Sequence, residues 1–97
     1  MWHGSMREAV EVFMLRHPRL ARAHGDFLSW LIENEDRLRM LRRNILGPGA
    51  TYVIYTPSRF GHSAVIACII SRNGIKVVRT SYAYVLRYKH TECWRAN

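Results

Sequence analysis

The sequence predicts an α+β domain in which N-terminal helices pack on one face of a three-stranded antiparallel β-meander. Apolar residues recur at helical spacing through residues 6–46, as far as a Gly-Pro-Gly stop at 47–49. β-branched and aromatic residues then form strand-like runs through residues 50–89, and Asn73-Gly74 separates the two longest runs. Ninety-seven residues allow a single domain over 1–97, with 91–97 as a tail. The helices are the available cover for one face of the sheet.

The helical part opens with a capping signal. Ser5, followed three residues later by Glu8, matches a capping box. Pro18 should end or kink this first helix and can open a second short turn, because the residue before a proline is pushed out of the α region. Residues 1–5 are either native or left by an expression vector, since Gly-Ser before an internal Met is a common cloning junction.

A helix over Phe27–Ile45 is the clearest element of the sequence. Gly25 is expected to stop the preceding turn and Asp26 to cap this helix. Acidic residues occupy its first half and arginines its second half, an order that complements the helix dipole. The Asn-Glu-Asp run at 34–36 offers an alternative in which the helix divides into two.

The hairpin organises the β part. Asn73-Gly74 predicts a two-residue type I′ turn, whose central residues both need positive φ. This turn places Ile70 opposite Val77, with side chains alternating between two faces. The bulky, uncharged face is expected to lie under the helices; it includes Val65, Ile69, Val78 and Tyr82. The other face should meet water or a partner; it carries Ile66, Ile70, Arg79 and Arg87.

The outer strands of the meander are less regular than the hairpin itself. Thr51–Thr56 is rich in β-branched and aromatic residues and predicts the first strand. The third strand, Ile75–Lys89, exceeds the usual strand length. A bend or bulge is therefore expected near residues 81–83.

Charge is distributed very unevenly along the chain. Four arginines against six carboxylates give residues 1–36 a net charge of −2, whereas eleven basic residues against Glu92 alone give residues 37–97 a net charge of +10. Thirteen of the fifteen basic residues are arginine, which can contact phosphate through two N–H groups at once. A basic half of this kind is typical of proteins that bind polyanions.

The leading hypothesis is therefore a small basic binding protein that contacts nucleic acid through arginines of the long helix and the hairpin. The candidate contact residues are Arg39, Arg42, Arg43, Arg59, Phe60, Arg72, Lys76, Arg79 and Arg87. Positions 39, 42 and 43 share one side of a helix, and Phe60 has a ring that could stack on a base. The same arginine row also fits an acidic partner helix or an ordinary solvated face.

Protein binding is the alternative function. A short basic chain of this kind suits a phage or mobile-element protein that binds and inhibits, or adapts, a host protein. The sheet face with Ile66 and Ile70 beside Arg79 would then be an apolar patch rimmed by charge. A homodimer through that open face, or through a free edge strand, is a further alternative.

Catalysis is less favoured than binding, and no cofactor is expected. The chain has no Gly-rich phosphate loop, serine nucleophile elbow or zinc-protease motif. His90 and Cys93 have ligand-like spacing, but the chain lacks the close Cys or His pairs of a structural zinc site. Helices before an antiparallel sheet bearing Arg, Tyr and His resemble, in order and composition, the small ribonuclease toxins of the RelE/ParE type. That resemblance implies metal-free RNA cleavage, with candidate groups Arg59, His62, Arg79, Tyr88 and His90.

The cellular location is expected to be the cytoplasm. The first residues contain no signal-peptide h-region, and no apolar run reaches the ~20 residues that a membrane helix needs. Cys68 and Cys93 do not form a disulfide framework and are expected to be free thiols in a reducing compartment.

Overall fold

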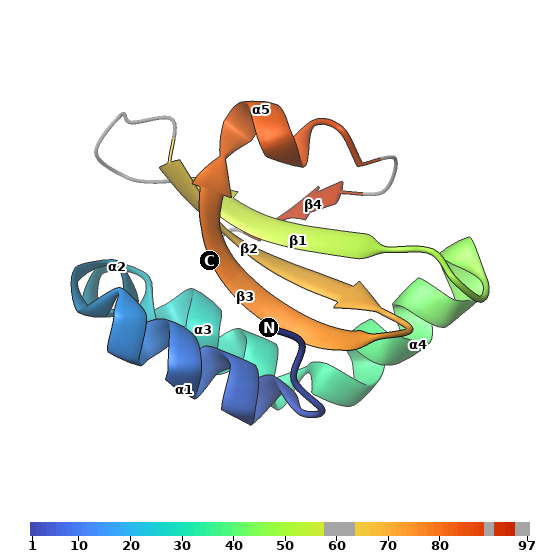
Figure 1. The fold of residues 1–97 in the computed structure, drawn as a ribbon, viewed down its shortest axis with the longest axis horizontal. Coiled ribbons are helices and arrows are strands. Elements are labelled where there is room, and N and C mark those ends of the chain that lie inside the picture. Colours follow the sequence, from blue (N-terminus) through green and yellow to red (C-terminus); the bar gives the residue numbers. More distant parts are fainter. Residues whose placement is uncertain (58–63, 89–90, 95–97) are drawn as a thin grey trace.

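A computed structural model describes residues 1–57, 64–88 and 91–94 of the protein. Four helices come first, followed by strands, one short helix and a last strand (Figure 1). The helices are α1 (Met6–Arg16), α2 (Pro18–Ala23), α3 (Gly25–Glu33), α4 (Glu35–Leu46) and α5 (Tyr82–Val85). The strands are β1 (Tyr52–Pro57), β2 (Ala64–Ser71), β3 (Gly74–Ser81) and β4 (Thr91–Cys93). Within the described ranges, none of the helices is long and apolar enough to cross a membrane.

The ends of the first two helices confirm the sequence signals. The Ser5 hydroxyl accepts a hydrogen bond from the backbone N–H of Glu8 at 3.2 Å and so caps α1. α1 ends at Arg16, and Pro18 is the first residue of α2, where its missing N–H costs nothing.

The predicted long helix is divided, and its predicted start was wrong. Asn34 separates α3 from α4, which confirms the alternative in which the helix breaks at 34–36. α2 ends at Ala23 with His24 as its C-cap, so Gly25 follows the end of that turn as predicted, but it also begins α3. Asp26 lies in the first turn of α3 instead of capping it. The physical reason is that Gly25 does not adopt the positive φ of a helix-ending glycine, so the chain re-enters a helix directly after His24.

The sheet contains one strand more than the sequence predicted. β1, β2 and β3 form the expected antiparallel meander, and β4 adds a parallel strand on the far side of β1. The described residues thus form an α+β fold with a four-stranded mixed sheet of order β3-β2-β1-β4. Residues 91–93, predicted to be a tail, form β4, and β3 forms the opposite edge of the sheet.

The third strand is shorter than predicted, because the chain leaves the sheet at Ser81. The Ser81 hydroxyl accepts a hydrogen bond from the Tyr84 N–H at 3.2 Å and caps the helical turn of α5. The predicted strand Ile75–Lys89 is therefore a strand as far as Ser81, followed by α5, which lies on the opposite side of the sheet from α1–α4 (Figure 1).

The hairpin register differs from the prediction by two positions. Ile70 pairs with Ile75 and not with Val77, and the turn residues are Arg72 and Asn73. A type I′ turn is absent because Asn73 does not have positive φ; in this hairpin only Gly74 does, with φ of 130°. A shift by two positions keeps the side chains of β2 and β3 in the same two sets, one on each face of the sheet.

The choice of the face under the helices was wrong. The main core contains Ile66, Cys68, Ile70, Ile75 and Val77 of the sheet, packed with Phe13, Phe27, Leu31 and Leu38 of the helices. Tyr82, predicted to lie in the core, is 46% exposed. Arg79 does not prevent burial of this face, because it lies at its end beside His17 and Pro18 and reaches solvent there.

The face predicted to lie under the helices is also buried, by a different element. Val53, Val65, Ala67 and Ile69 form a second buried cluster with Val85 of α5. Val78 packs against this cluster. α5 therefore covers this face of the sheet, which α1–α4 leave open.

Candidate anion-binding site

Four arginines surround a cleft of about 520 Å³ where the end of α4 meets the hairpin turn. α4 supplies three of them, and the β2–β3 turn, which lies beside α4 in Figure 1, supplies Arg72. The cleft is lined by Arg39, Arg42, Arg43, Pro48, Gly49, Ile70, Ser71 and Arg72. The structure thus brings together four of the nine predicted contact residues, from two segments about thirty residues apart in the sequence.

Arg42 is the most buried of the four arginines of the cleft. Its side chain is buried, and its Nε donates a hydrogen bond to the carbonyl oxygen of Ala50 at 2.9 Å; its Nη2 donates a second to the same oxygen. The loop makes this contact possible because Gly47 and Gly49 adopt positive φ, 73° and 85°, and turn the chain back past the end of α4. Arg42 therefore joins α4 to the Gly-Pro-Gly loop.

Arg39 is held in place by hydrogen bonds to Glu35 and Gly4. Its Nε donates to Glu35 Oε2 at 3.1 Å, one turn earlier in α4, and its Nη2 donates to the carbonyl oxygen of Gly4 at 2.7 Å. Glu35 is itself fixed, because its Oε1 accepts a hydrogen bond from the Met6 N–H at 2.6 Å. Residues 1–5, whichever their origin, thus take part in positioning an arginine of the cleft.

Arg43 and Arg72 are the exposed cations of the cleft. Neither makes an ion pair or a hydrogen bond through its side chain with another described residue. No carboxylate is among the lining residues, and the acidic residues of α4, Glu35 and Asp36, lie at its opposite end. The cleft therefore combines two fixed guanidinium groups with two that are available to a ligand.

Of the remaining predicted contact residues, the three that the structure describes do not line the cleft. Lys76 extends over the ring of Trp2, with Nζ 4.5 Å from the ring centroid. Arg79 lies near the end of β3, and Arg87 is exposed after α5. Arg59 and Phe60 lie outside the described residues.

The candidate ribonuclease groups are not assembled by the described part of the chain. Arg79 shares the helix-covered face of the sheet with Val77, whereas Tyr88 packs on the opposite face. Burial, together with a hydrogen bond to the Tyr84 hydroxyl, raises the pKa of Tyr88 from its ordinary value of 10.0 to about 12. His62, His90 and Arg59 lie outside the described residues.

Two buried polar groups have raised pKa values without forming a reactive site. Burial raises the pKa of the Cys68 thiol, which lies 3.6 Å from the Met6 sulfur inside the core. Burial also raises the pKa of Tyr52, and the Glu92 carboxylate nearby adds to the shift without reaching good hydrogen-bond geometry. Among residues 1–57, 64–88 and 91–94, no three His, Cys, Asp or Glu side chains are grouped so that they could hold a metal ion.

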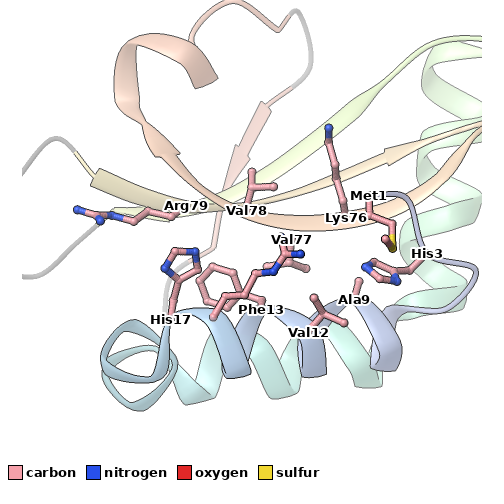
Figure 2. Close-up of a pocket in the computed structure, with 11 residues that line it drawn as sticks. Met1, His3, Ala9, Val12, Phe13, His17, Lys76, Val77, Val78 and Arg79 are labelled. Atoms are coloured by element: carbon pink, nitrogen blue, oxygen red, sulfur yellow. The ribbon is translucent and has the colours of Figure 1, made fainter.

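A groove beside β3 was not predicted from the sequence. It is lined by Val12 and Phe13 of α1, by His17 directly after α1, and by Lys76, Val77 and Arg79 of β3 (Figure 2). The sequence could not reveal it, because Arg16 and His17 stand more than fifty residues before β3. The sequence did predict a free edge strand in the hairpin, but it did not indicate that a helix lies beside that edge.

Comparison of the chain with protein-family models, with curated proteins and with solved structures found no significant match to any of them.

Proposed function

We propose that the protein binds the phosphate backbone of nucleic acid, in the cytoplasm, through the cleft formed by Arg39, Arg42, Arg43 and Arg72. The convergence of these four arginines on one cleft without a lining carboxylate is the observation that carries the proposal. The +10 net charge of residues 37–97 supports it, because a basic surface raises the local concentration of a polyanion and speeds its association.

Each arginine has its own role in this proposal. Arg39 and Arg42 are already oriented by hydrogen bonds to Glu35, Gly4 and Ala50, so little side-chain freedom is lost when they meet a phosphate. Arg43 and Arg72 are exposed on the two sides of the cleft and would form the direct contacts with phosphate oxygens.

The proposal favours backbone recognition over base recognition. Arginines contribute the charged side chains of the lining, and the described lining contains no aromatic ring on which a base could stack. The expected complex is therefore formed with little dependence on base sequence and is strongly weakened by salt.

Fluorescence anisotropy of labelled single-stranded RNA, single-stranded DNA and duplex DNA tests the proposal. Each neutralised phosphate contributes about −0.9 on a duplex, or about −0.7 on a single strand, to the slope of log K against log salt. A slope between roughly −1.4 and −3.6 is expected for contacts by two to four arginines. Inorganic phosphate and pyrophosphate are added as competitors. Absent or salt-independent binding would contradict the proposal, and so would displacement of the oligonucleotide by equimolar pyrophosphate, which would indicate a small-anion site.

A further inference from the structure

The edge strand β3 has an open stretch of backbone beside α1. His3 pairs with Ile75 on this edge: the His3 N–H donates to the Ile75 carbonyl at 2.7 Å, and the Ile75 N–H donates to the His3 carbonyl at 2.9 Å. In an antiparallel strand, alternate residues direct both backbone groups to the same side. The N–H and C=O groups of Val77 and Arg79 therefore face away from β2, as those of Ile75 do.

The outward backbone groups of this stretch have no hydrogen-bond partner among the described residues. No described backbone or side chain forms a hydrogen bond with the outward groups of Val77 or Arg79. Met1, two residues before the paired His3 and in line with Val77, lines the groove, but it is 85% exposed and forms no backbone hydrogen bond with Val77. The added strand that His3 begins thus stops after one pair.

The groove beside this edge is apolar at its base and basic at its end. Val12 and Phe13 of α1 lie along it next to Val77, and His17 and Arg79 stand together farther along (Figure 2). Arg16 and Lys76 also line the groove, and Arg19 lies beside Arg79 in an adjoining hollow. The carboxylate of Glu8 is engaged by His3 at 3.6 Å, and no carboxylate is among the lining residues.

We propose that this groove binds an extended acidic segment of a partner protein, which adds a strand to the β3 edge at Val77 and Arg79. The proposal goes beyond nucleic-acid binding at the arginine cleft and uses a different surface. An added antiparallel strand would form backbone hydrogen bonds with Val77 and Arg79. Residues two apart on that strand point to the same side, so an apolar side chain would face Val77 and Phe13 and a carboxylate would face Arg79.

Two other occupants fit the groove less well. A second copy of this chain would bring Arg79 and its basic neighbours against the same residues, in a protein whose net charge is already +8. A nucleic-acid backbone presents phosphate oxygens, which are acceptors, and would leave the outward carbonyl groups of Val77 and Arg79 unpaired. A polypeptide has both donors and acceptors in the spacing that the strand requires.

Titration of the isotope-labelled protein by NMR with a capped peptide of about seven residues, in which glutamate stands two positions before valine and threonine fills the other positions, tests the proposal. The expected result is saturable binding that shifts the Val77 and Arg79 amide signals and protects both amides from exchange. A peptide of the same sequence, N-methylated at alternate residues to remove the pairing N–H groups, should bind at least about tenfold more weakly. A peptide with lysine in place of glutamate should do the same.

Two protein variants separate charge from backbone pairing. Arg79→Ala should weaken binding of the glutamate peptide about tenfold, whereas Arg22→Ala, an exposed arginine of α2 outside the groove, should leave it unchanged. Val77→Pro removes one outward N–H without removing a bond to β2, and proline is tolerated in this orientation on an edge strand. It should also weaken binding.

Three results would overturn the proposal. The first is equal binding of the methylated and unmethylated peptides. The second is an oligonucleotide that shifts the Val77 and Arg79 amides as the peptide does. The third is a concentration-dependent dimer in which both amides are protected without peptide. None of these results depends on whether the arginine cleft binds nucleic acid, so the two proposals can fail separately.

Discussion

The guanidinium of Arg42 donates two hydrogen bonds to the carbonyl oxygen of Ala50, from Nε at 2.9 Å and from Nη2. Ala50 lies between the Gly-Pro-Gly loop and β1, so this contact fixes the end of α4 to the start of the sheet. Pro48 and Gly49 of the same loop line the cleft, so the contact also positions one of its walls. The arginine that the sequence predicted as a ligand contact is therefore also part of the scaffold.

Replacing Arg42 should destabilise the protein. In Arg42→Ala the Ala50 carbonyl loses both donors in a partly buried position, which should lower the free energy of unfolding by about 1–3 kcal/mol. Arg43→Ala, one position away but exposed, should change it by less than about 0.5 kcal/mol. Urea unfolding followed by circular dichroism measures both, and equal midpoints for the two variants would show that the Ala50 contact contributes nothing.

Gly74 should not tolerate a side chain. Its φ is 130°, and a Cβ at this position would lie 2.6 Å from the carbonyl oxygen of His3. We expect Gly74→Ala to lower the free energy of unfolding by about 1–3 kcal/mol through backbone strain, with loss of the His3–Ile75 pair in addition.

The matched control for Gly74 is Gly4→Ala. A Cβ on Gly4 meets no atom within 4 Å, and Gly4 does not have positive φ, so this variant should unfold within about 0.5 kcal/mol of the parent protein. Equal destabilisation by the two alanines would mean that the close approach of His3 to Gly74 is unimportant. Loss of exchange protection at the Ile75 amide in Gly74→Ala, but not in Gly4→Ala, would confirm that this close approach matters.

The Tyr84–Tyr88 pair should make the protein sensitive to alkaline pH. The pKa of Tyr88 is raised to about 12 in the folded state, first by burial and then by the Tyr84 hydroxyl, from an ordinary value of 10.0. Because the folded state favours the neutral phenol, this stabilisation is present below pH 10 and is lost as the pH rises toward 12.

Tyr88→Phe tests that pH dependence directly. The variant lacks the titrating group, so its unfolding midpoint in urea should fall less steeply than that of the parent between pH 10 and 12. Leu86→Ala, an exposed residue of the same segment without a titrating group, serves as the control. Parallel pH profiles for the parent and Tyr88→Phe would contradict the assigned pKa.

Single residues with a strong local preference correctly predicted helix ends. Ser5, Pro18 and Gly47 act through their own side-chain or backbone chemistry, so the helix ends that they mark were found in the structure. The strands β1 and β2 followed from their composition. Asp26 was wrongly predicted as a cap because aspartate is favourable both at the N-cap and in the first turn of a helix.

The choice of sheet face depended on distant parts of the chain. The stretch 64–70 carries no charged side chain on either face, so its pattern did not distinguish them. The charge of Arg79 predicted that its face of the sheet is exposed, but Arg79 lies at the end of a buried face. The second face is buried because residues 82–85 form α5 and place Val85 over it. β4 was missed because three residues are too short for a periodic pattern.

The candidate site was predicted in part. The spacing of Arg39, Arg42 and Arg43 placed them on one side of a helix, which the cleft confirms. Their meeting with Arg72 could not be predicted, because it depends on the hairpin turn lying at the end of α4. Likewise, the spacing gave no indication that Arg39 and Arg42 are engaged by Glu35 and by the Ala50 carbonyl.

The most direct test of the proposed function is the salt dependence of oligonucleotide binding by Arg72→Glu compared with Arg22→Glu. Both variants change the net charge equally and replace an exposed arginine, but Arg22 lies in α2, outside the cleft lining. Arg72→Glu should bind at least about tenfold more weakly than the parent, with a salt slope shallower by about 0.7–0.9, whereas Arg22→Glu should lose much less affinity and keep the slope. Equal losses for the two variants would show that binding depends on overall charge alone and would contradict a site at the arginine cleft.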